Sequence, residues 1–205
     1  MNSHAATMVI VRGLPGGKFE ALVLYYTKSS ADRRPFSSWK FPTETGEKSE
    51  SRWMTASNGM YRELSKTPDN TEGFDFKSLD AFGDKGEPEP FLVCRVPGDP
   101  GKGSEWHDKC VFLISLNQES VCKLRTEEKW DGPDELLGVP EFVEAGELWK
   151  RMLERGQPFH RAVLYKTIER FASTSQKAYD NYRSILEDPR SLEAMTSKGK
   201  MIKFE

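Results

Sequence analysis

The sequence predicts an α/β domain in which helices cover the faces of a mixed central sheet. Short apolar runs rich in β-branched residues lead the chain, and amphipathic helical segments close it. One helical segment also follows the third predicted strand. This order favours a mixed sheet over an all-parallel array of alternating strands and helices.

Two apolar runs predict a hairpin near the start of the chain. Residues 8–12 (MVIVR) and 21–26 (ALVLYY) have strand-like composition, and the second run is apolar throughout, which is typical of a central strand. Between them, residues 14–17 (LPGG) predict a tight turn. We expect residues 32–38 to form a polar loop and residues 39–42 (WKFP) a third strand closed by its proline.

Two later runs predict another pair of strands. Residues 91–96 (FLVCRV) and 109–116 (KCVFLISL) are apolar, and the segment between them is rich in glycine, proline and lysine. That segment does not have phosphate-loop spacing, because Val96 stands where the motif requires a glycine. We therefore interpret it as the connection of a long hairpin.

The first predicted helix covers residues 53–66. Trp53, Ala56, Met60 and Leu64 recur at spacings of three and four and form one apolar stripe. Gly59 weakens a helix by about 1 kcal/mol relative to alanine. We expect the helix to end before Pro68, which disfavours helical geometry in the preceding residue.

The second half of the chain predicts an acidic, irregular segment at 127–138 and then helices. Pro140 is suited to a first helical position, and Gly156 to a helix end. Further helices are predicted at 159–171 and around 178–186. We expect one domain over residues 1–172 and a charged, partly helical C-terminal extension over 173–205.

Composition excludes several classes of function. The formal net charge is -2, which gives no electrostatic case for a nucleic-acid partner. No apolar run approaches the roughly 20 residues of a membrane-spanning helix, and the first seven residues lack the regions of a signal peptide. The three cysteines have no metal-ligand spacing. We therefore expect a cytoplasmic protein without a membrane partner.

Residues 39–66 carry the most chemically informative pattern. A proline-ended strand leads into an acidic loop and then into the helix that bears Arg62-Glu63-Leu64. Helical positions i, i+3 and i+4 share a face, so carboxylates there can converge on a divalent cation. Such a cation activates water and neutralises phosphate charge.

These residues resemble the Nudix hydrolase superfamily. Its motif runs Gly, five residues, Glu, seven residues, Arg-Glu, an aliphatic residue, any residue, Glu-Glu, any residue, Gly. Trp39-Lys40-Phe41-Pro42 is similar to the lead-in of the motif, and Arg62-Glu63-Leu64 to its helical centre. The similarity in layout covers roughly residues 8–153. It implies a Nudix-like α/β/α sandwich and a pyrophosphohydrolase that uses Mg²⁺ or Mn²⁺, with Glu63 as metal ligand or base and Arg62 orienting it.

The sequence departs from that motif at the metal-binding positions. The Glu-Glu pair falls on Lys66 and Thr67, and the final glycine on Asp69. An ammonium on the same helix face as Glu63 would compete with a cation. Replacement metal ligands could come from Glu44, Glu47 and Glu50 in the preceding loop. A late acidic segment offers others, namely Glu127, Glu128, Asp131, Asp134 and Glu135.

Two functional hypotheses follow. In the first, the metal-binding motif is eroded, hydrolysis is weak or absent, and the protein binds a nucleotide-like or other phosphate-bearing small molecule through Lys66, Arg33 and Arg34. In the alternative, it is an active Mg²⁺- or Mn²⁺-dependent hydrolase of nucleoside diphosphate-linked compounds, with metal ligands Glu63, Glu47 and Glu50. A homodimer is compatible with either. An accidental resemblance would leave only an α/β domain.

Overall fold

The computed structural model describes residues 4–30, 33–46, 50–66, 76–80, 82–83, 86–97, 106–131, 133–197 and 199–204. The chain divides into two compact units. Unit 1 comprises Met1–Val11, Phe41–Thr126 and Ile202–Glu205, and unit 2 comprises Arg12–Lys40 and Glu127–Met201. The boundary predicted after residue 172 stays a prediction.

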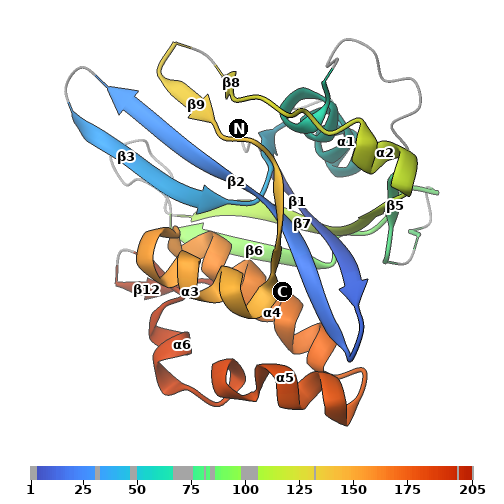
Figure 1. Cartoon of the computed structure of the whole chain (residues 1–205). Helices are drawn as coiled ribbons and strands as arrows, with labels where there is room; N and C mark the ends of the chain where they lie inside the picture. Colours follow the sequence, from blue (N-terminus) through green and yellow to red (C-terminus); the bar gives the residue numbers. More distant parts are fainter. Residues whose placement is uncertain are drawn as a thin grey trace. The chain divides into compact units, whose positions relative to one another are not determined.

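Unit 1 is built on a mixed sheet with the strand order β13-β6-β7-β1. Figure 1 labels the last three of these strands. β1 runs parallel to β7, whereas the other pairs are antiparallel, including β4 on β1 and β5 on β7. The strand bounds are β1 (Ala5–Leu14, in unit 1 up to Val11), β4 (Thr43–Thr45), β5 (Phe76–Ser78), β6 (Leu92–Pro97), β7 (Trp106–Leu116) and β13 (Lys203–Phe204).

The apolar runs recognised in the sequence form the core of unit 1. Residues 8–11 of β1 and 110–114 of β7 are buried, as expected for β-branched and aromatic side chains at the centre of a sheet. The predictions of strands at 8–12, 91–96 and 109–116 are confirmed.

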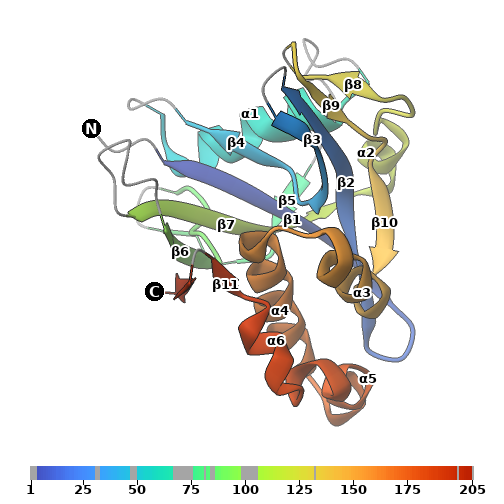
Figure 2. The same cartoon turned by 90° about the vertical axis from the view of Figure 1, so that its left-hand side faces the viewer.

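Helix α1 (Arg52–Leu64) packs against β4 in unit 1, as Figure 2 shows. Ser51 caps its start by accepting a hydrogen bond from the backbone N–H of Met54 at 3.1 Å. The predicted helix is confirmed, but it ends at Leu64 because Ser65 has extended backbone. Pro68, predicted to stop it, lies outside the described residues. A short helix, α2 (Gln118–Cys122), follows β7.

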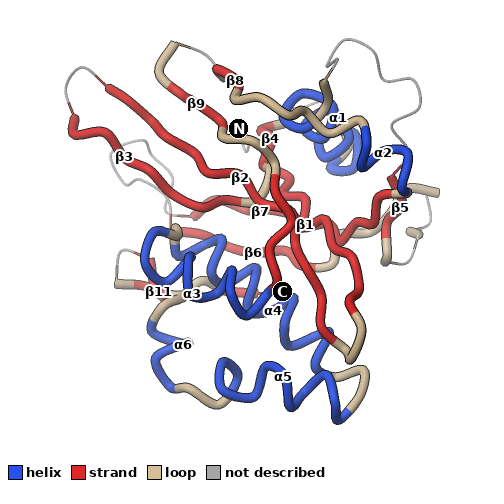
Figure 3. Tube along the Cα trace, viewed as in Figure 1, coloured by secondary structure: helices blue, strands red, loops and turns tan. Residues whose placement is uncertain are grey.

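Unit 2 combines an antiparallel ribbon with helices, coloured by type in Figure 3. β2 pairs with β3, β9 and β10, and β9 pairs with β8. The strands are β2 (Lys18–Ser30), β3 (Arg33–Lys40), β8 (Lys129–Trp130), β9 (Glu135–Leu137) and β10 (Glu141–Glu144). The turn before β2 is confirmed, and Gly16 and Gly17 have φ of 82° and 80°, which favours glycine.

The helices of unit 2 are α3 (Ala145–Arg155), α4 (Pro158–Ala172), α5 (Gln176–Leu186) and α6 (Pro189–Glu193). They precede a small hairpin of β11 (Thr196–Ser197) and β12 (Lys200–Met201). α4 packs against α3 and α5, and most of its buried residues are apolar. The predicted helices at 159–171 and 178–186 are confirmed, and α5 packs on the helix before it.

Two predicted loops are wrong in part. Residues 33–38, expected to be a polar loop, belong to β3, because pairing with β2 satisfies their backbone. Within the acidic segment at 127–138, β8 and β9 form an antiparallel pair that extends the ribbon. In both places the cross-strand partner, rather than the local composition, decides the structure.

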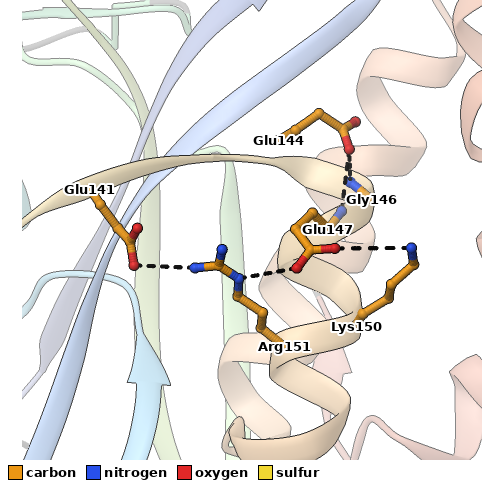
Figure 4. Close-up of polar contacts among 6 residues, drawn as sticks. All are labelled: Glu141, Glu144, Gly146, Glu147, Lys150 and Arg151. Carbon is orange, nitrogen blue, oxygen red and sulfur yellow. Dashed lines mark hydrogen bonds and ion pairs between the residues drawn. The ribbon is translucent and has the colours of Figure 1, made fainter.

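The predicted helix start at Pro140 is also wrong. Residues 141–144 form β10, and Glu144 caps α3 by accepting hydrogen bonds from the backbone N–H groups of Gly146 and Glu147 at 3.1 and 3.2 Å (Figure 4). Gly156 does end α3, but with extended backbone. A Cβ at residue 156 would lie 2.4 Å from the Met152 carbonyl oxygen, which explains the glycine.

No helix in the part of the chain that the structure describes is both long and apolar enough to span a membrane.

Candidate functional site

Arg62 and Glu44 form the ion pair at the centre of the candidate site. The distance from Arg62 Nη2 to Glu44 Oε2 is 3.1 Å. The Glu44 side chain is 11% exposed and that of Arg62 is 51% exposed, so a nearly buried carboxylate meets a half-exposed guanidinium. The other Glu44 oxygen accepts a hydrogen bond from the backbone N–H of Thr45 at 3.0 Å.

Gly59 makes this arrangement possible. A Cβ at residue 59 would lie 2.7 Å from the Cβ of Glu44 and 2.7 Å from Cε of Met8. Real side chains do not approach so closely, so only glycine lets α1 lie directly on β4 here. The glycine that weakens the helix in isolation thus brings Arg62 within reach of Glu44.

Glu63, predicted as the metal ligand or base, is 1% exposed. Arg125, itself buried, donates from Nε to the Glu63 carbonyl oxygen at 2.6 Å, and its backbone N–H donates to the Leu64 carbonyl oxygen at 2.8 Å. These two bonds satisfy carbonyl groups that a helix C-terminus otherwise leaves without partners. No sequence pattern predicts this role of Arg125, because the two segments are distant in the chain.

Glu50 is held by two neighbours. Its Oε1 accepts a hydrogen bond from Asn58 Nδ2 at 3.2 Å, and its Oε2 accepts one from Thr55 Oγ1 at 3.2 Å. The Thr55 hydroxyl also lies 2.9 Å from Nε2 of His4. Glu50 therefore secures the start of α1, and its role as a metal ligand stays a prediction. Glu47 lies outside the described residues.

Lys66 does not lie on the α1 face assigned to it by the sequence. Because the helix ends at Leu64, Lys66 follows the helix cap, and its backbone N–H donates to the Lys123 carbonyl oxygen at 3.2 Å. Its ammonium donates to the Cys122 carbonyl oxygen at 3.0 Å. Lys66 therefore does not share a helix face with Glu63, and the predicted competition between its ammonium and a metal cation at Glu63 does not follow from helix geometry. Lys66 remains an exposed cation beside α2.

The other predicted ligand-binding cations, Arg33 and Arg34, lie in β3 of unit 2. The lead-in tryptophan, Trp39, is at the opposite end of the same strand. Its ring lies 4.9 Å from that of Tyr25, and the Arg151 guanidinium lies 5.2 Å above it. Figure 4 shows Arg151 bound on either side by Glu141 and Glu147, at 3.2 and 3.3 Å. Trp39 thus anchors α3 on the ribbon of unit 2.

The late acidic segment belongs to unit 2 and is engaged there. Glu135 accepts hydrogen bonds from Tyr26, at 3.1 Å, and from Lys28. Burial alone would raise the pKa of Glu135, but these hydrogen bonds outweigh it and lower the pKa below its ordinary value. Asp134 lies 3.9 Å from Lys28, whereas Glu127 and Glu128 are exposed. The metal-binding role considered for this segment stays a prediction.

The donor set for a divalent cation is incomplete in the described residues. No three His, Cys, Asp or Glu side chains there lie close enough together to hold a metal ion. Around α1, Glu44 is neutralised by Arg62, and Glu50 is hydrogen-bonded to protein groups. The described side chains thus supply no cluster of three carboxylates for Mg²⁺, whose other oxygen ligands in proteins are commonly waters and substrate phosphates.

Comparisons with known proteins give matches among solved structures. Neither a protein-family model nor a curated protein sequence matches the chain. Among solved structures, it is similar to the Nudix hydrolase RenU from M. smegmatis, with a TM-score of 0.51 and 14% identity over 83% of this chain and 87% of that one. It is also similar to a candidate NUDIX hydrolase from Listeria monocytogenes, with a TM-score of 0.52 and 14% identity over 83% and 94% of the two chains.

This chain has the Nudix fold. The predicted Nudix-like α/β class is therefore confirmed. At 14% identity, the likeness establishes the fold alone. The chemistry has to be argued from the side chains of this protein. The segment that resembles the motif in the sequence forms β3, β4 and α1.

Proposed function

We propose that this Nudix-fold protein binds a phosphate-bearing small molecule, such as a nucleotide, and hydrolyses it weakly or not at all. The proposal rests on how the carboxylate side chains around α1 are paired, hydrogen-bonded and buried. Glu44 is paired with Arg62, Glu50 is hydrogen-bonded to Asn58 and Thr55, and Glu63 is 1% exposed. None of these described groups is arranged with two others to hold a metal ion.

Exposed cations support a phosphate-bearing ligand. Arg62 is half exposed beside Glu44, and Lys66 is exposed beyond the end of α1. Guanidinium and ammonium groups are the usual protein partners of phosphate oxygens. Arg33 and Arg34 of β3 remain proposed further contacts, and a homodimer remains a proposal.

The Nudix fold also supports the alternative of a metal-dependent hydrolase. Mg²⁺ or Mn²⁺ would then supply a Lewis acid and an activated water. The chain would hold the ion through Glu63, Glu50 and Glu47. This alternative needs at least one further carboxylate to turn towards Glu63.

The two functions are separated by measuring binding and turnover on the same samples. Nucleoside diphosphates and dinucleoside polyphosphates would be titrated calorimetrically, and phosphate release would be followed with Mg²⁺ or Mn²⁺. We expect at least one compound to bind, with release no faster than in Glu63→Gln. The Gln side chain has the same shape as Glu, so it serves as a matched control. Release that is lost in Glu63→Gln would establish the hydrolase instead.

A further inference from the structure

We propose that Arg125 is the permanent counter-charge of the Glu63 carboxylate, and that it positions this side chain at the end of α1 without a divalent cation. Glu63 is the residue that the resemblance to the Nudix motif designates as metal ligand or base. The inference goes beyond the proposed function, because it concerns the charges at the end of α1 whatever ligand the protein binds. It is carried by the burial of both side chains and by the hydrogen bonds that join their segments.

The segment that follows α2 runs antiparallel to the end of α1. Ser65 and Leu124 form an antiparallel bridge, and the backbone N–H of Arg125 donates to the Leu64 carbonyl oxygen at 2.8 Å. Both segments belong to unit 1. These backbone contacts fix Arg125 beside the last turn of α1 and direct its side chain from a defined position.

The side chain of Arg125 reaches back to Glu63. Its Nε donates to the Glu63 carbonyl oxygen at 2.6 Å, so the guanidinium contacts the residue that bears the carboxylate. Arg125 is 6% exposed and Glu63 is 1% exposed. Two residues of opposite charge are therefore in contact at a place that little water reaches.

Such burial requires that each charge be compensated. An isolated carboxylate or guanidinium in the protein interior is strongly unfavourable, because the interior does not solvate it as water does. An opposite charge on a neighbouring segment compensates both groups, and their attraction is stronger in the interior than in water. Because the guanidinium of arginine stays protonated in proteins, Arg125 provides this charge at every physiological pH.

The same guanidinium opposes a divalent cation at Glu63. An ion bound to this carboxylate would lie close to the positive charge of Arg125, and like charges repel most strongly where water is excluded. Arg125 thus orients the Glu63 carboxylate and withdraws it from metal binding. Weak or absent hydrolysis is the expected consequence.

Paired substitutions of Arg125 separate charge compensation from simple capping of the helix carbonyl. Arg125→Lys keeps the positive charge, whereas Arg125→Gln keeps an N–H donor and removes the charge. Urea unfolding of the full chain should give a higher midpoint for Arg125→Lys than for Arg125→Gln. In the Glu63→Gln background this advantage of lysine should vanish or reverse, because no carboxylate is left to compensate.

The double variant Glu63→Gln/Arg125→Gln keeps the test decisive if Arg125→Gln alone does not fold. It carries no charge at either position, so it should be more stable than Arg125→Gln. A pure capping role predicts instead that lysine and glutamine at residue 125 are equivalent, and that Arg125→Gln shifts the midpoint equally in both backgrounds. That result, or a double variant no more stable than Arg125→Gln, would overturn the inference.

Mn²⁺ provides a second readout. Thermal unfolding would be measured with and without Mn²⁺ in the wild-type protein and in Glu63→Gln. We expect the ion to change Tm equally in both, because Arg125 keeps it away from Glu63. A rise in Tm with Mn²⁺ that Glu63→Gln abolishes would overturn the inference. No nucleotide or phosphate is present in these measurements, so ligand binding by the protein keeps its own separate test.

Discussion

Glu44 of β4 and Gly59 of α1 are in such close contact that residue 59 has no room for a side chain. A Cβ at that position would lie 2.7 Å from the Glu44 Cβ. Glycine costs a helix interior about 1 kcal/mol relative to alanine. The contact it permits brings the helix close enough for Arg62 to pair with Glu44 at 3.1 Å. The weakest residue of α1 by helix propensity is therefore the one that positions the ion pair of Arg62 and Glu44.

Gly59→Ala should lower the free energy of unfolding. Overpacking costs about 1–3 kcal/mol, whereas the gain in helix propensity is about 1 kcal/mol, so we expect a net loss of up to about 2 kcal/mol. Urea denaturation followed by circular dichroism measures it. Gly13→Ala is the control, because a Cβ at residue 13 meets nothing within 4 Å. An increase in stability of Gly59→Ala would contradict the tight packing of α1 on β4.

Ser51→Ala should destabilise α1. The Ser51 hydroxyl oxygen accepts the Met54 N–H at 3.1 Å, and the hydroxyl donates to Glu87 Oε1 at 2.9 Å. Loss of a helix N-cap of this kind costs about 1 kcal/mol. Ser57→Ala is the matched control on the same helix, because among the described residues its hydroxyl donates only to the Trp53 carbonyl oxygen within the helix. Equal unfolding midpoints in urea for the two variants would show that the cap contributes nothing.

Tyr182→Phe should destabilise unit 2 by about 1–3 kcal/mol, the cost of leaving a buried polar group without its partner. The fully buried Tyr182 hydroxyl accepts the Phe19 backbone N–H at 3.0 Å and donates to Glu144 at 3.3 Å. The isosteric change leaves the Phe19 N–H unsatisfied without opening a cavity. Tyr179→Phe, on the same helix but bonded to Glu187 at the surface, should cost less than half as much in thermal unfolding.

The same tyrosine makes stability depend on alkaline pH. Burial, and then the nearby Glu144 charge, raise the pKa of Tyr182 above its ordinary value of 10.0. Because the folded state favours the protonated form, this contribution is complete below pH 10 and is lost as the pH rises towards the raised pKa. Unfolding free energies measured from pH 9 to 11.5 should fall, and fall less in Tyr182→Phe. Part of the decrease in unfolding free energy with pH should remain in Tyr182→Phe, because burial also raises the pKa of Tyr26.

The fold was predictable where local pattern and tertiary packing agree. The runs 8–12 and 109–116 are apolar and strand-like, and they pair in parallel at the centre of a sheet. The stripe of Ala56, Met60 and Leu64 predicts both the helix and its buried side. Prediction failed at β3 and β10, where polar or helix-like residues become strand because β2 offers them backbone partners.

The sequence predicts which residue types lie at the candidate site, but not which of their side chains meet. Arg62 and Glu63 were recognised from the motif, but spacing along the chain carries no information about which carboxylate an arginine meets. The pairing of Arg62 with Glu44 depends on the approach at Gly59, and the contact of Arg125 with the Glu63 carbonyl joins segments 62 residues apart. Lys66 does not lie where the motif predicts it, because α1 ends at Leu64 and Ser65 has extended backbone.

Thiol labelling should single out Cys122. Cys94 and Cys110 are buried in unit 1, whereas Cys122 is exposed. Burial, and then the neighbouring Cys110, raise the pKa of the Cys94 thiol to about 12, and burial also raises that of Cys110. Since the thiolate is the reactive form, these two should resist a thiol reagent at pH 8 in the folded protein.

We expect one fast thiol per chain with Ellman's reagent, none in Cys122→Ser, and all three thiols of the wild-type protein in denaturant. Fast labelling of two thiols would contradict the packing of β6 on β7.

A fluorophore on Cys122 would lie beside Lys66, whose ammonium donates to the Cys122 carbonyl oxygen at 3.0 Å. If Lys66 contacts a phosphate group of the ligand, the fluorescence should change on addition of pyrophosphate to the labelled protein and should not change in labelled Lys66→Met.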